Sequence, residues 1–236
     1  IMPSLVGSEM CIRDRIFQMG PLDQGWWPDG LYTAPSDEAL LFDIKAMKKL
    51  GFNMIRKHIK VEPSRWYMHC DREGILVWQD LPSPNLPEGH EAFARQNFEE
   101  EAVRIIDAFE NHPSIVQWVV FNEGWGQFDT ERMTQVVIDK VSPQSLVCCA
   151  SGWNDAEIGD IKDSHSYPYP SCPIDQKRAC VNGEYGGITL KVPGHIWPGG
   201  DFGYTTVETP EDFTVMFNDL ADKIKDHYYY GLNAAV

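Results

Sequence analysis

Two glutamates each lie at the end of an apolar run that has the composition of a buried strand. Glu123 follows the run at residues 118–122, and Glu184 lies near the end of the run at residues 179–185. An ionised carboxylate at the tip of a buried strand is unfavourable unless it is paired or used in chemistry. Two carboxyl groups roughly 5 to 5.5 Å apart can cleave a glycosidic bond, because one protonates the leaving oxygen while the other attacks the anomeric carbon. The alternative is two surface acids that are solvated or paired with arginines.

Other residues that could bind or catalyse also fall near the ends of predicted strands. Because side chains alternate along a strand, Arg56 and His58 share one face. Arg56 near Glu184 would keep that carboxylate ionised, and its negative charge would help Glu123 to keep a proton. A core or loop-capping role is the alternative for these residues. In chain order the candidates are Asp23, Arg56, His58, Asp80, Asn122, Trp153, His165 and Tyr167.

Aromatic side chains beside polar loop residues could contact a sugar. The chain is 12% aromatic, and Trp153 and Trp197 both lie in predicted loops. The flat apolar face of tryptophan suits the CH-rich face of a sugar ring, whereas packing beneath a loop is the alternative. The sequence therefore adds Trp153 and Trp197 to the candidate substrate-binding residues.

The elements that must position these residues alternate between helix and strand patterns. Ser36 is a good N-cap for a helix, acidic residues come directly after it, and Gly51 ends the apolar periodicity. Thr209 and Pro210 begin the last predicted helix in a similar way. These signals and the apolar runs predict helices over residues 37–50, 64–73, 91–112, 130–141 and 210–229, and strands over residues 16–20, 52–58, 75–79, 114–121, 145–150, 161–167, 179–185 and 231–236.

Strands that alternate with helices over about 220 residues are typical of an α/β fold of the (β/α)8 barrel, or TIM barrel, type. A doubly wound open sheet is the alternative. No GxGxxG or GxxxxGKS/T motif opens a helix after a strand, which argues against the nucleotide-binding version of that fold. In a barrel the carboxyl ends of the strands meet at one rim, where active sites lie. The candidate residues are therefore expected around one pocket.

The composition excludes several classes of partner. The chain has 35 acidic and 20 basic residues and a formal net charge of −15, so a nucleic acid would be repelled. No apolar stretch reaches the about 18 residues needed to cross a bilayer, so no membrane partner is expected. None of the six cysteines has the spacing of a CxxC pair or a zinc site. The sequence therefore predicts neither a metal nor another cofactor.

The first residues differ from the rest of the chain. The segment IMPSLVGSEMCIRDR shares no periodicity with the residues after it and resembles a translated sequencing adaptor. We therefore expect residues 1–15 to be a non-native leader and residues 16–236 to form the barrel domain. The leader lacks the order of a signal peptide, so the compartment is open, with the bacterial periplasm or cell exterior favoured over the cytoplasm.

Several long motifs resemble one family. From Pro21 to Val236 the chain is similar to the catalytic barrel of glycoside hydrolase family 2, the β-galactosidase, β-glucuronidase and β-mannosidase group. This resemblance implies a retaining β-glycosidase that hydrolyses terminal β-linked sugars. The motifs are LDQGWWPDGLYTAP, GFNMIRKHIKVEP, LVWQDLP, NHPSIVQWVVFNEGWGQ, HSYPYP and NGEYGG.

The same resemblance implies individual roles for four residues. Glu123, in the Asn-Glu pair, would be the general acid/base, and Glu184, in GEYGG, would be the nucleophile. Asn122 would hydrogen-bond the sugar 2-hydroxyl, an interaction that strengthens in the transition state. Tyr167 would orient the nucleophile or hydrogen-bond it.

The chain also departs from the family pattern. His58 lies two residues after Arg56, whereas family members commonly place this histidine three residues after the arginine. The β-sandwich domains that usually precede the barrel are absent, and the last strand is cut at Val236. We therefore expect a gene fragment whose barrel is incomplete at the eighth strand and exposes unpaired edges there.

Two other functions are open. A barrel that binds carbohydrate without cleaving it would keep the same polar and aromatic residues. A metal-dependent barrel hydrolase would use His58, His165 and several aspartates. Enzymes that resemble the amidohydrolases carry an HxH motif on the first strand, however, and IFQMG at residues 16–20 has no histidine. The sequence therefore favours a glycosidase.

Overall fold

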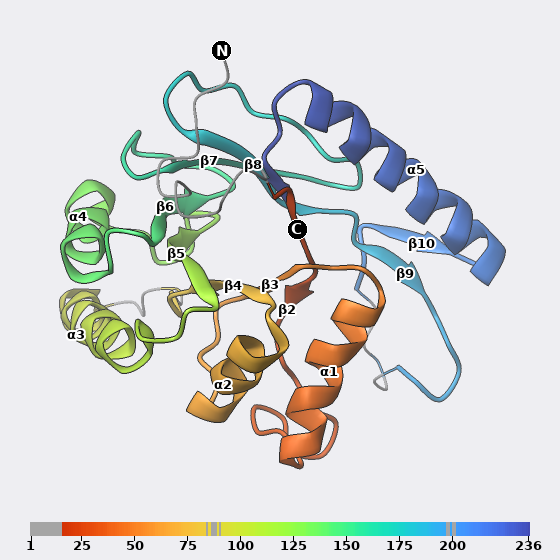
Figure 1. The fold of residues 1–236 in the computed structure, drawn as a ribbon, viewed down its shortest axis with the longest axis horizontal. Helices are drawn as coiled ribbons and strands as arrows, with labels where there is room; N and C mark the ends of the chain where they lie inside the picture. Colours follow the sequence, from red (N-terminus) through yellow and green to blue (C-terminus); the bar gives the residue numbers. More distant parts are fainter. Residues whose placement is uncertain (1–15, 84, 86–88, 90, 197–198, 200–201) are drawn as a thin grey trace.

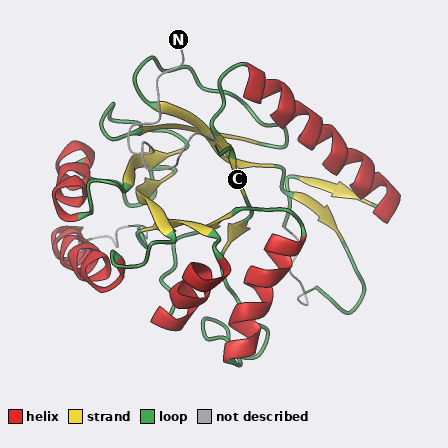
Figure 2. Cartoon of the chain, viewed as in Figure 1, coloured by secondary structure: helices red, strands yellow, loops and turns green. Residues whose placement is uncertain are grey.

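The computed structural model describes residues 16–236 except 84, 86–88, 90, 197–198 and 200–201. The expectations for the leader at residues 1–15 and for Trp197 therefore lie outside the described residues. The described chain forms a ring of parallel strands with helices around much of its outside (Figures 1 and 2). None of the helices in these residues is long and apolar enough to span a membrane.

The ring consists of two parallel sheets with the strand orders β2-β3-β4-β5-β6 and β1-β11-β8-β7. The first barrel strand is divided, because β1 (Gln18–Met19) continues as β2 (Leu22–Asp23) after Gly20. A Cβ atom on Gly20 would lie 1.7 Å from the carbonyl oxygen of Met54, so only glycine permits this close approach of two strands. The other strands of the ring are β3 (Met54–Lys57), β4 (Leu76–Asp80), β5 (Ile115–Asn122), β6 (Leu146–Ser151), β7 (Ile161–Ser166), β8 (Ala179–Tyr185) and β11 (Ala234–Ala235).

The ring is interrupted at a different place from the one that the sequence predicts. The last strand, β11, has only two residues, yet Ala234 pairs with Val181 of β8 and with Gln18 of β1. Within the described residues no backbone ladder joins β6 to β7. Side chains make much of this connection, and one of its bonds runs from Ser151 Oγ to Asp163 Oδ2 (2.5 Å). We call this junction the β6–β7 seam.

Helices cover the outside of the ring between β2 and β6 and again after β8 (Figure 1). Ser36 Oγ accepts a hydrogen bond from Ala39 N (3.2 Å) at the start of the first helix, and Thr209 Oγ1 accepts one from Asp212 N (3.1 Å) at the start of the last. Both predicted N-caps are therefore confirmed. The helices are α1 (Asp37–Lys49), α2 (Ser64–Glu73), α3 (Glu91–Phe109), α4 (Thr130–Lys140) and α5 (Pro210–Tyr229).

Two connections lack the helix that regular alternation requires. Residues 152–160, between β6 and β7, and residues 167–178, between β7 and β8, contain no helix. The first connection is short, and the second includes three prolines, which interrupt helical hydrogen bonding. The helix ranges predicted from the sequence also leave both connections without a helix, so the structure agrees with them here. Between β8 and α5 the chain adds a small parallel sheet of β9 (Ile188–Leu190) and β10 (Thr205–Val207).

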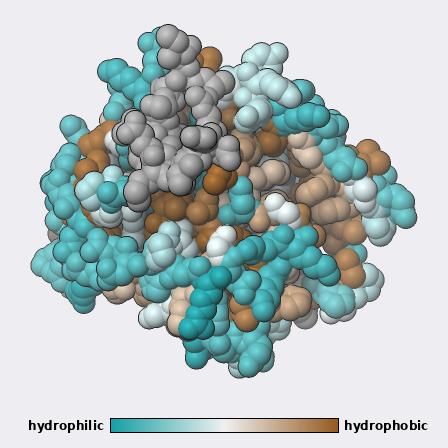
Figure 3. Space-filling model, in the orientation of Figure 1, coloured by the Kyte–Doolittle hydropathy of each residue, from teal (hydrophilic) through white to brown (hydrophobic). Residues whose placement is uncertain are grey.

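The two faces of the strands pack in different layers. Trp118 and Phe121 pack beneath the helices, whereas Met54 and Trp78 pack inside the ring. Burying one such large apolar side chain stabilises the fold by about 1.5–3 kcal/mol. Figure 3 shows apolar residues near the centre of the face in view, within a margin of hydrophilic ones. Side chains alternate along a strand, so a residue two positions after an inward-facing apolar residue also points into the ring. Toward the carboxyl ends of the strands these inward-facing residues are polar.

Candidate active site

Glu123 begins the turn after β5. Its backbone has a positive φ of 53°, a conformation that is strained for any residue except glycine. The Glu123 amide donates a hydrogen bond to the Ser151 carbonyl oxygen (2.9 Å), which ties the turn to the end of β6. Strain of this kind is characteristic of sites where the fold fixes the direction of one side chain.

Glu184 lies within β8 and is almost entirely buried, with 6% of its surface exposed. Two donors reach its carboxylate: Arg56 Nη1 at 3.3 Å from Oε1, and the Tyr167 hydroxyl at 2.5 Å from Oε2. Both interactions favour a negative charge on this carboxylate. The predicted contact between Arg56 and Glu184 is therefore present.

Arg56 organises several groups at the bottom of the pocket. Its guanidinium is completely buried and makes a two-point contact with Asp80, with Nε at 3.0 Å from Oδ1 and Nη2 at 2.9 Å from Oδ2. Nη2 also donates to Asn122 Oδ1 (2.8 Å). Burial alone would lower the pKa of Arg56, but the charges of Asp80 and Glu184 raise it above its ordinary value. The arginine therefore stays charged next to Glu184.

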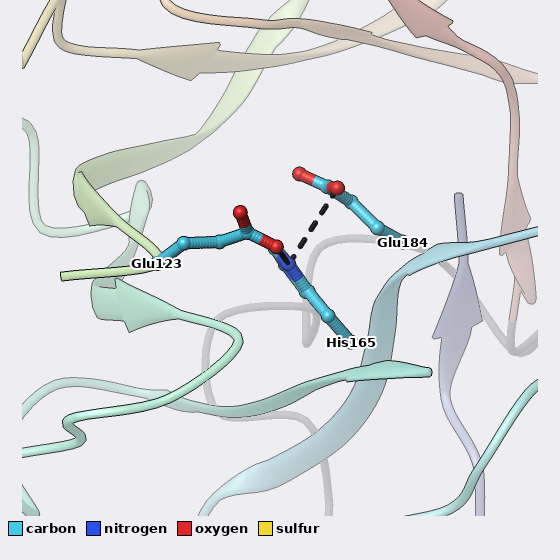
Figure 4. Close-up of side chains that lie close together, drawn as sticks. All are labelled: Glu123, His165 and Glu184. Atoms are coloured by element: carbon cyan, nitrogen blue, oxygen red, sulfur yellow. Dashed lines mark hydrogen bonds and ion pairs between the residues drawn. The ribbon is translucent and has the colours of Figure 1, made fainter. Parts of the chain in front are cut away.

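His165 lies between the two glutamates (Figure 4). Its Nδ1 atom is 2.7 Å from Glu123 Oε1 and 3.6 Å from Glu184 Oε2. One carboxylate oxygen from each glutamate and one ring nitrogen of His165 all lie within 4.8 Å of one another. The two carboxyl groups therefore lie close to each other, as the sequence predicts.

The same three side chains could offer one ligand atom each to a metal ion. His165 and the two glutamates have the residue types and the spacing that such a site needs. The positive guanidinium of Arg56, 3.3 Å from Glu184 Oε1, disfavours a second cation beside that carboxylate. A carboxylate pair bridged by a histidine accounts for the cluster better.

Two tryptophans lie against Glu123 and are about half exposed. Trp153 Nε1 donates to the main-chain oxygen of Glu123 (2.8 Å), and Trp125 Nε1 donates to its Oε2 atom (3.3 Å). Trp153 is thus close enough to the acid to act as a sugar platform, which stays a prediction. The sequence did not single out Trp125 for a role, although it lies in the same motif.

Tyr167 and Tyr204 form an aromatic stack beside Glu184. Their ring centroids are 3.7 Å apart and their planes differ by 10°. Burial and the hydrogen bond to Glu184 raise the pKa of Tyr167, so its hydroxyl remains a donor. Tyr204 comes from the segment between β9 and β10, far along the chain, and sequence reasoning missed it because no motif surrounds it.

Asp80 and Asp23 lie at the ends of β4 and β2, and both have partners inside the protein. Asp80 is 1% exposed, and its carboxylate accepts hydrogen bonds from Arg56 and from His58 Nδ1 (2.8 Å). Burial opposes ionisation of Asp80, but Arg56 and His58 hold its pKa below the usual value. Asp23 accepts from Lys57 Nζ (2.6 Å) and from the Gly25 amide (2.8 Å). Both aspartates therefore bind protein groups, and a sugar contact by either one stays a prediction.

The two predicted histidine ligands also have partners inside the protein. The side chain of His165 has no exposed surface, so it orients the glutamates rather than facing solvent. The side chain of His58 is 10% exposed and bonds Asp80, and its Nδ1 atom is 4.0 Å from Glu184 Oε1. A direct sugar contact by His58 stays a prediction.

Sequence reasoning also missed two polar residues behind His165. Ser151 Oγ lies 2.7 Å from His165 Nε2 and donates to Asp163 Oδ2 (2.5 Å). The other oxygen of Asp163 accepts from the Gly183 amide (2.6 Å). Burial raises the pKa of Asp163 above its ordinary value, although His165 and Arg56 act in the opposite direction.

Comparisons with known proteins agree on one family. The family described as glycosyl hydrolases family 2, TIM barrel domain, matches residues 33–186. The chain therefore belongs to glycosyl hydrolase family 2 and contains its TIM barrel domain.

Curated relatives include several bacterial enzymes. A β-galactosidase from Halalkalibacterium halodurans is 34% identical over 103 residues, which cover 37% of this chain and 10% of that protein. A β-galactosidase from Yersinia enterocolitica is 32% identical over 155 residues, which cover 59% of this chain and 14% of that protein. A putative β-glucuronidase from Formosa agariphila is 32% identical over 103 residues, covering 44% of this chain and 12% of that protein. The matched part is thus a small fraction of each relative.

Solved structures show the same fold. An FMN-binding β-glucuronidase from Facaelibacterium prausnitzii L2-6 has a TM-score of 0.70 and 18% identity, covering 94% of this chain and 38% of that one. A β-galacturonidase from Eisenbergiella tayi, solved with galacturonate, has a TM-score of 0.68 and 17% identity, covering 92% of this chain and 42% of that one.

Proposed function

We propose that the protein to which this chain belongs is a retaining β-glycosidase that removes terminal β-linked sugars. The observation that supports this most directly is the approach of oxygens from Glu123 and Glu184 to within 4.8 Å of each other. Retaining enzymes hold their carboxyl groups roughly 5 to 5.5 Å apart, whereas inverting enzymes leave roughly 6.5 to 9.5 Å for a water molecule. The spacing therefore favours a covalent intermediate.

In the first step Glu184 is the nucleophile. One of its carboxylate oxygens forms a bond to the anomeric carbon as the bond from that carbon to the leaving oxygen breaks. The departing electron pair stays on the leaving oxygen, which takes the proton of Glu123. The products are an aglycone alcohol and a sugar esterified to Glu184.

In the second step Glu123 is the base. Its carboxylate removes a proton from water while the water oxygen attacks the anomeric carbon. The bond to Glu184 breaks, and its electron pair returns to the carboxylate. Two inversions at one carbon restore the β configuration, and Glu123 is protonated again.

The two carboxyl groups have unequal surroundings, which supports unequal roles. Glu184 receives a charged donor from Arg56 and a hydroxyl donor from Tyr167, and both stabilise an anionic nucleophile. Glu123 receives no hydrogen bond from the Arg56 guanidinium among the described contacts; its nearest ring partner is His165. The two carboxyl groups therefore face different donors, which is the kind of asymmetry that an acid and a nucleophile need.

The substrate is proposed to be a β-linked sugar of the kinds named by the relatives. Those names include β-galactosidase and β-glucuronidase, and one neighbouring structure holds galacturonate. Asn122 would contact the 2-hydroxyl, and Trp153 would stack on the ring. A panel of nitrophenyl β-glycosides, including galactoside, glucuronide and galacturonide, would identify the sugar.

Azide rescue tests the two assignments together in the full-length protein. Glu184→Ala should lower kcat by roughly 10⁴-fold or more, because it removes the nucleophile. Azide should then fill the space, attack the anomeric carbon directly and give the α-glycosyl azide from an activated substrate. Glu123→Ala should instead give the β-glycosyl azide, since azide then replaces water in the second step. Product configuration is read by proton NMR.

The same configuration from both variants, or normal turnover by Glu184→Ala, would reject these roles. Binding of sugar by calorimetry without hydrolysis of any glycoside in the panel would identify a barrel that binds carbohydrate but does not cleave it. Glu131→Ala, a change at an exposed position on α4, is the control and should leave kcat within about twofold of the parent.

A further inference from the structure

A chain of hydrogen bonds runs from Glu123 into the interior of the protein. Glu123 Oε1 lies 2.7 Å from His165 Nδ1, and His165 Nε2 lies 2.7 Å from Ser151 Oγ. Ser151 in turn donates to Asp163 Oδ2 (2.5 Å). Ser151 is completely buried and Asp163 is 5% exposed, so the inner half of this chain is shielded from water. It crosses the β6–β7 seam, where no backbone ladder lies.

The surroundings of His165 determine which ring nitrogen carries a proton. Nδ1 faces oxygens of both glutamates, at 2.7 and 3.6 Å. Arg56 and Tyr167 favour the anion of Glu184, so a lone pair on Nδ1 would face a negative charge. A hydrogen on Nδ1 removes this repulsion and donates to Glu123. We therefore take Nδ1 as the donor, the tautomer that best fits these surroundings.

Nδ1 can remain a donor in two arrangements of the inner chain. In the first, Asp163 is protonated and the direction of its hydrogen bond with Ser151 is reversed, so Asp163 donates to Ser151 and Ser151 donates to Nε2 of a neutral imidazole. In the second, the Asp163 proton has passed to Ser151 Oγ while the Ser151 proton has passed to Nε2, giving an imidazolium and a carboxylate. Both hold the same number of protons and both leave the hydrogen on Nδ1. Burial raises the pKa of Asp163, which keeps the first arrangement accessible.

We propose that Ser151 and Asp163 are positioning residues that keep the Nδ1–H group of His165 donating a hydrogen bond to Oε1 of Glu123. Because Oε1 is occupied by this hydrogen bond, the acidic proton of Glu123 is confined to Oε2. This rests on the proposed function of Glu123 as acid/base. Oε2 is the oxygen that His165 leaves free of its hydrogen bond, and it contacts the half-exposed Trp125 (3.3 Å). In the first step Oε2 delivers the proton, and in the second step Oε2 takes the proton of water. His165 donates to Oε1 in both.

Leaving-group dependence tests this inference in the full-length enzyme. A phenyl glycoside needs protonation of its leaving oxygen, whereas a 2,4-dinitrophenyl glycoside hardly does. Ser151→Ala and Asp163→Asn should each lower kcat/KM for the phenyl glycoside by about tenfold or more, part of the 10²–10⁴-fold that general acid catalysis supplies. Each should lower kcat/KM for the dinitrophenyl glycoside by less than about threefold. Ser151→Thr, which keeps the hydroxyl, should recover most of the phenyl glycoside activity.

Ser164→Ala is the matched control. Ser164 is also a serine of the seam strands, but its hydroxyl bonds Ser171 Oγ (3.0 Å) and does not join the chain to Glu123. This variant should change kcat/KM for both substrates by less than about twofold. Thermal unfolding of all variants identifies any that fail to fold. If Asp163→Asn fails to fold, the result for Ser151→Ala alone tests the positioning role.

The results also separate this inference from the proposed function. Glu123→Ala must itself lose the phenyl glycoside selectively, and if it does not, the acid/base assignment fails. If Glu123→Ala shows that pattern while Ser151→Ala loses both substrates equally or neither, the positioning role is overturned and the glycosidase stands.

Discussion

Arg56 distinguishes the two carboxyl groups at the scale of single residues. Its guanidinium contacts Glu184, Asn122 and Asp80, all within 3.3 Å, while Glu123 lies beyond its hydrogen bonds. One buried cation thus supports the anion on one side of the pocket and aligns the amide that would meet the sugar 2-hydroxyl. A lysine could not make the same two-point contact with Asp80.

The hydroxyl of Tyr167 should contribute directly to turnover. Tyr167→Phe removes a donor 2.5 Å from Glu184 Oε2. A hydrogen bond to a charged group is worth about 1.5–3 kcal/mol, so kcat/KM should fall roughly 10- to 150-fold on a nitrophenyl glycoside. Tyr204→Phe keeps the 3.7 Å ring stack and should cost about twofold or less. Equal losses in both variants would assign the effect to the stack instead.

The sequence identified the residues of the site that end strands inside long motifs, such as Glu123, Glu184 and Arg56. It placed Asp23 and Asp80 on the rim correctly but not their partners, because a strand end does not specify which neighbour a carboxylate will meet. Ser151 and Asp163 escaped notice since serine and aspartate are common residues. Their significance arises only where β6 and β7 lie side by side.

At the scale of elements, Gly20 allows the divided first strand to approach β3. A Cβ atom at this position would overlap the Met54 carbonyl group, which is backbone and cannot move aside. Gly20→Ala should therefore destabilise the full-length protein by about 3 kcal/mol or more, measured by urea unfolding. Gly51→Ala is the comparison, because nothing lies within 4 Å of a Cβ atom there and only its φ of +94° is unfavourable. Its cost should be about 1–2 kcal/mol, and equal costs would contradict the steric explanation.

The starts of α1 and α5 were predictable because each N-cap residue bonds an amide close to it in the sequence. Ser36 and Thr209 accept the expected amide hydrogen bonds, and these depend on residues three positions away. The absence of a helix from the two connections after β6 and β7 was predictable, because no helical pattern falls there, but their conformation was not. Their conformation depends on contacts with distant strands, as in the bond from Val147 N to Asp160 Oδ2 (2.9 Å), and local patterns do not encode such contacts.

At the scale of the whole molecule, the two connections without helices, between β6 and β8, are joined by ion pairs. Asp155 receives both terminal nitrogens of Arg178 at 2.8 Å and Lys162 Nζ at 2.6 Å. Burial opposes its ionisation, but these two cations lower the pKa of Asp155 below the usual value. The charged form therefore stabilises this side of the ring.

This cluster should make stability depend on pH. Since the folded-state pKa of Asp155 is depressed, its contribution is fully present above the unfolded-state value of about 3.9 and is lost as the pH falls toward the folded-state value. Asp155→Asn should lower Tm at pH 7 by the equivalent of about 1–3 kcal/mol, and the difference from the parent should shrink below pH about 4. Glu100→Gln, which removes an exposed pair with Arg104, should change stability by about 0.5 kcal/mol or less. A difference for Asp155→Asn that is constant from pH 7 to 3 would contradict this account.

The β6–β7 seam differs from the other strand junctions of the ring, because no backbone ladder joins its two strands in the described part of the chain. Backbone ladders form with almost any side chains, so those junctions tolerate substitution. At the seam the Ser151–Asp163 side-chain bond supplements only isolated bonds among the residues that the structure describes, such as that from Asp160 N to the Val147 carbonyl oxygen (2.8 Å). Local opening of a folded protein is easiest where few backbone hydrogen bonds hold the elements together. Ser151 of this seam contacts His165, which contacts Glu123, whereas Glu184 lies on β8, which has backbone ladders to both β7 and β11. We therefore expect a substitution that widens the seam to displace Glu123 more than Glu184.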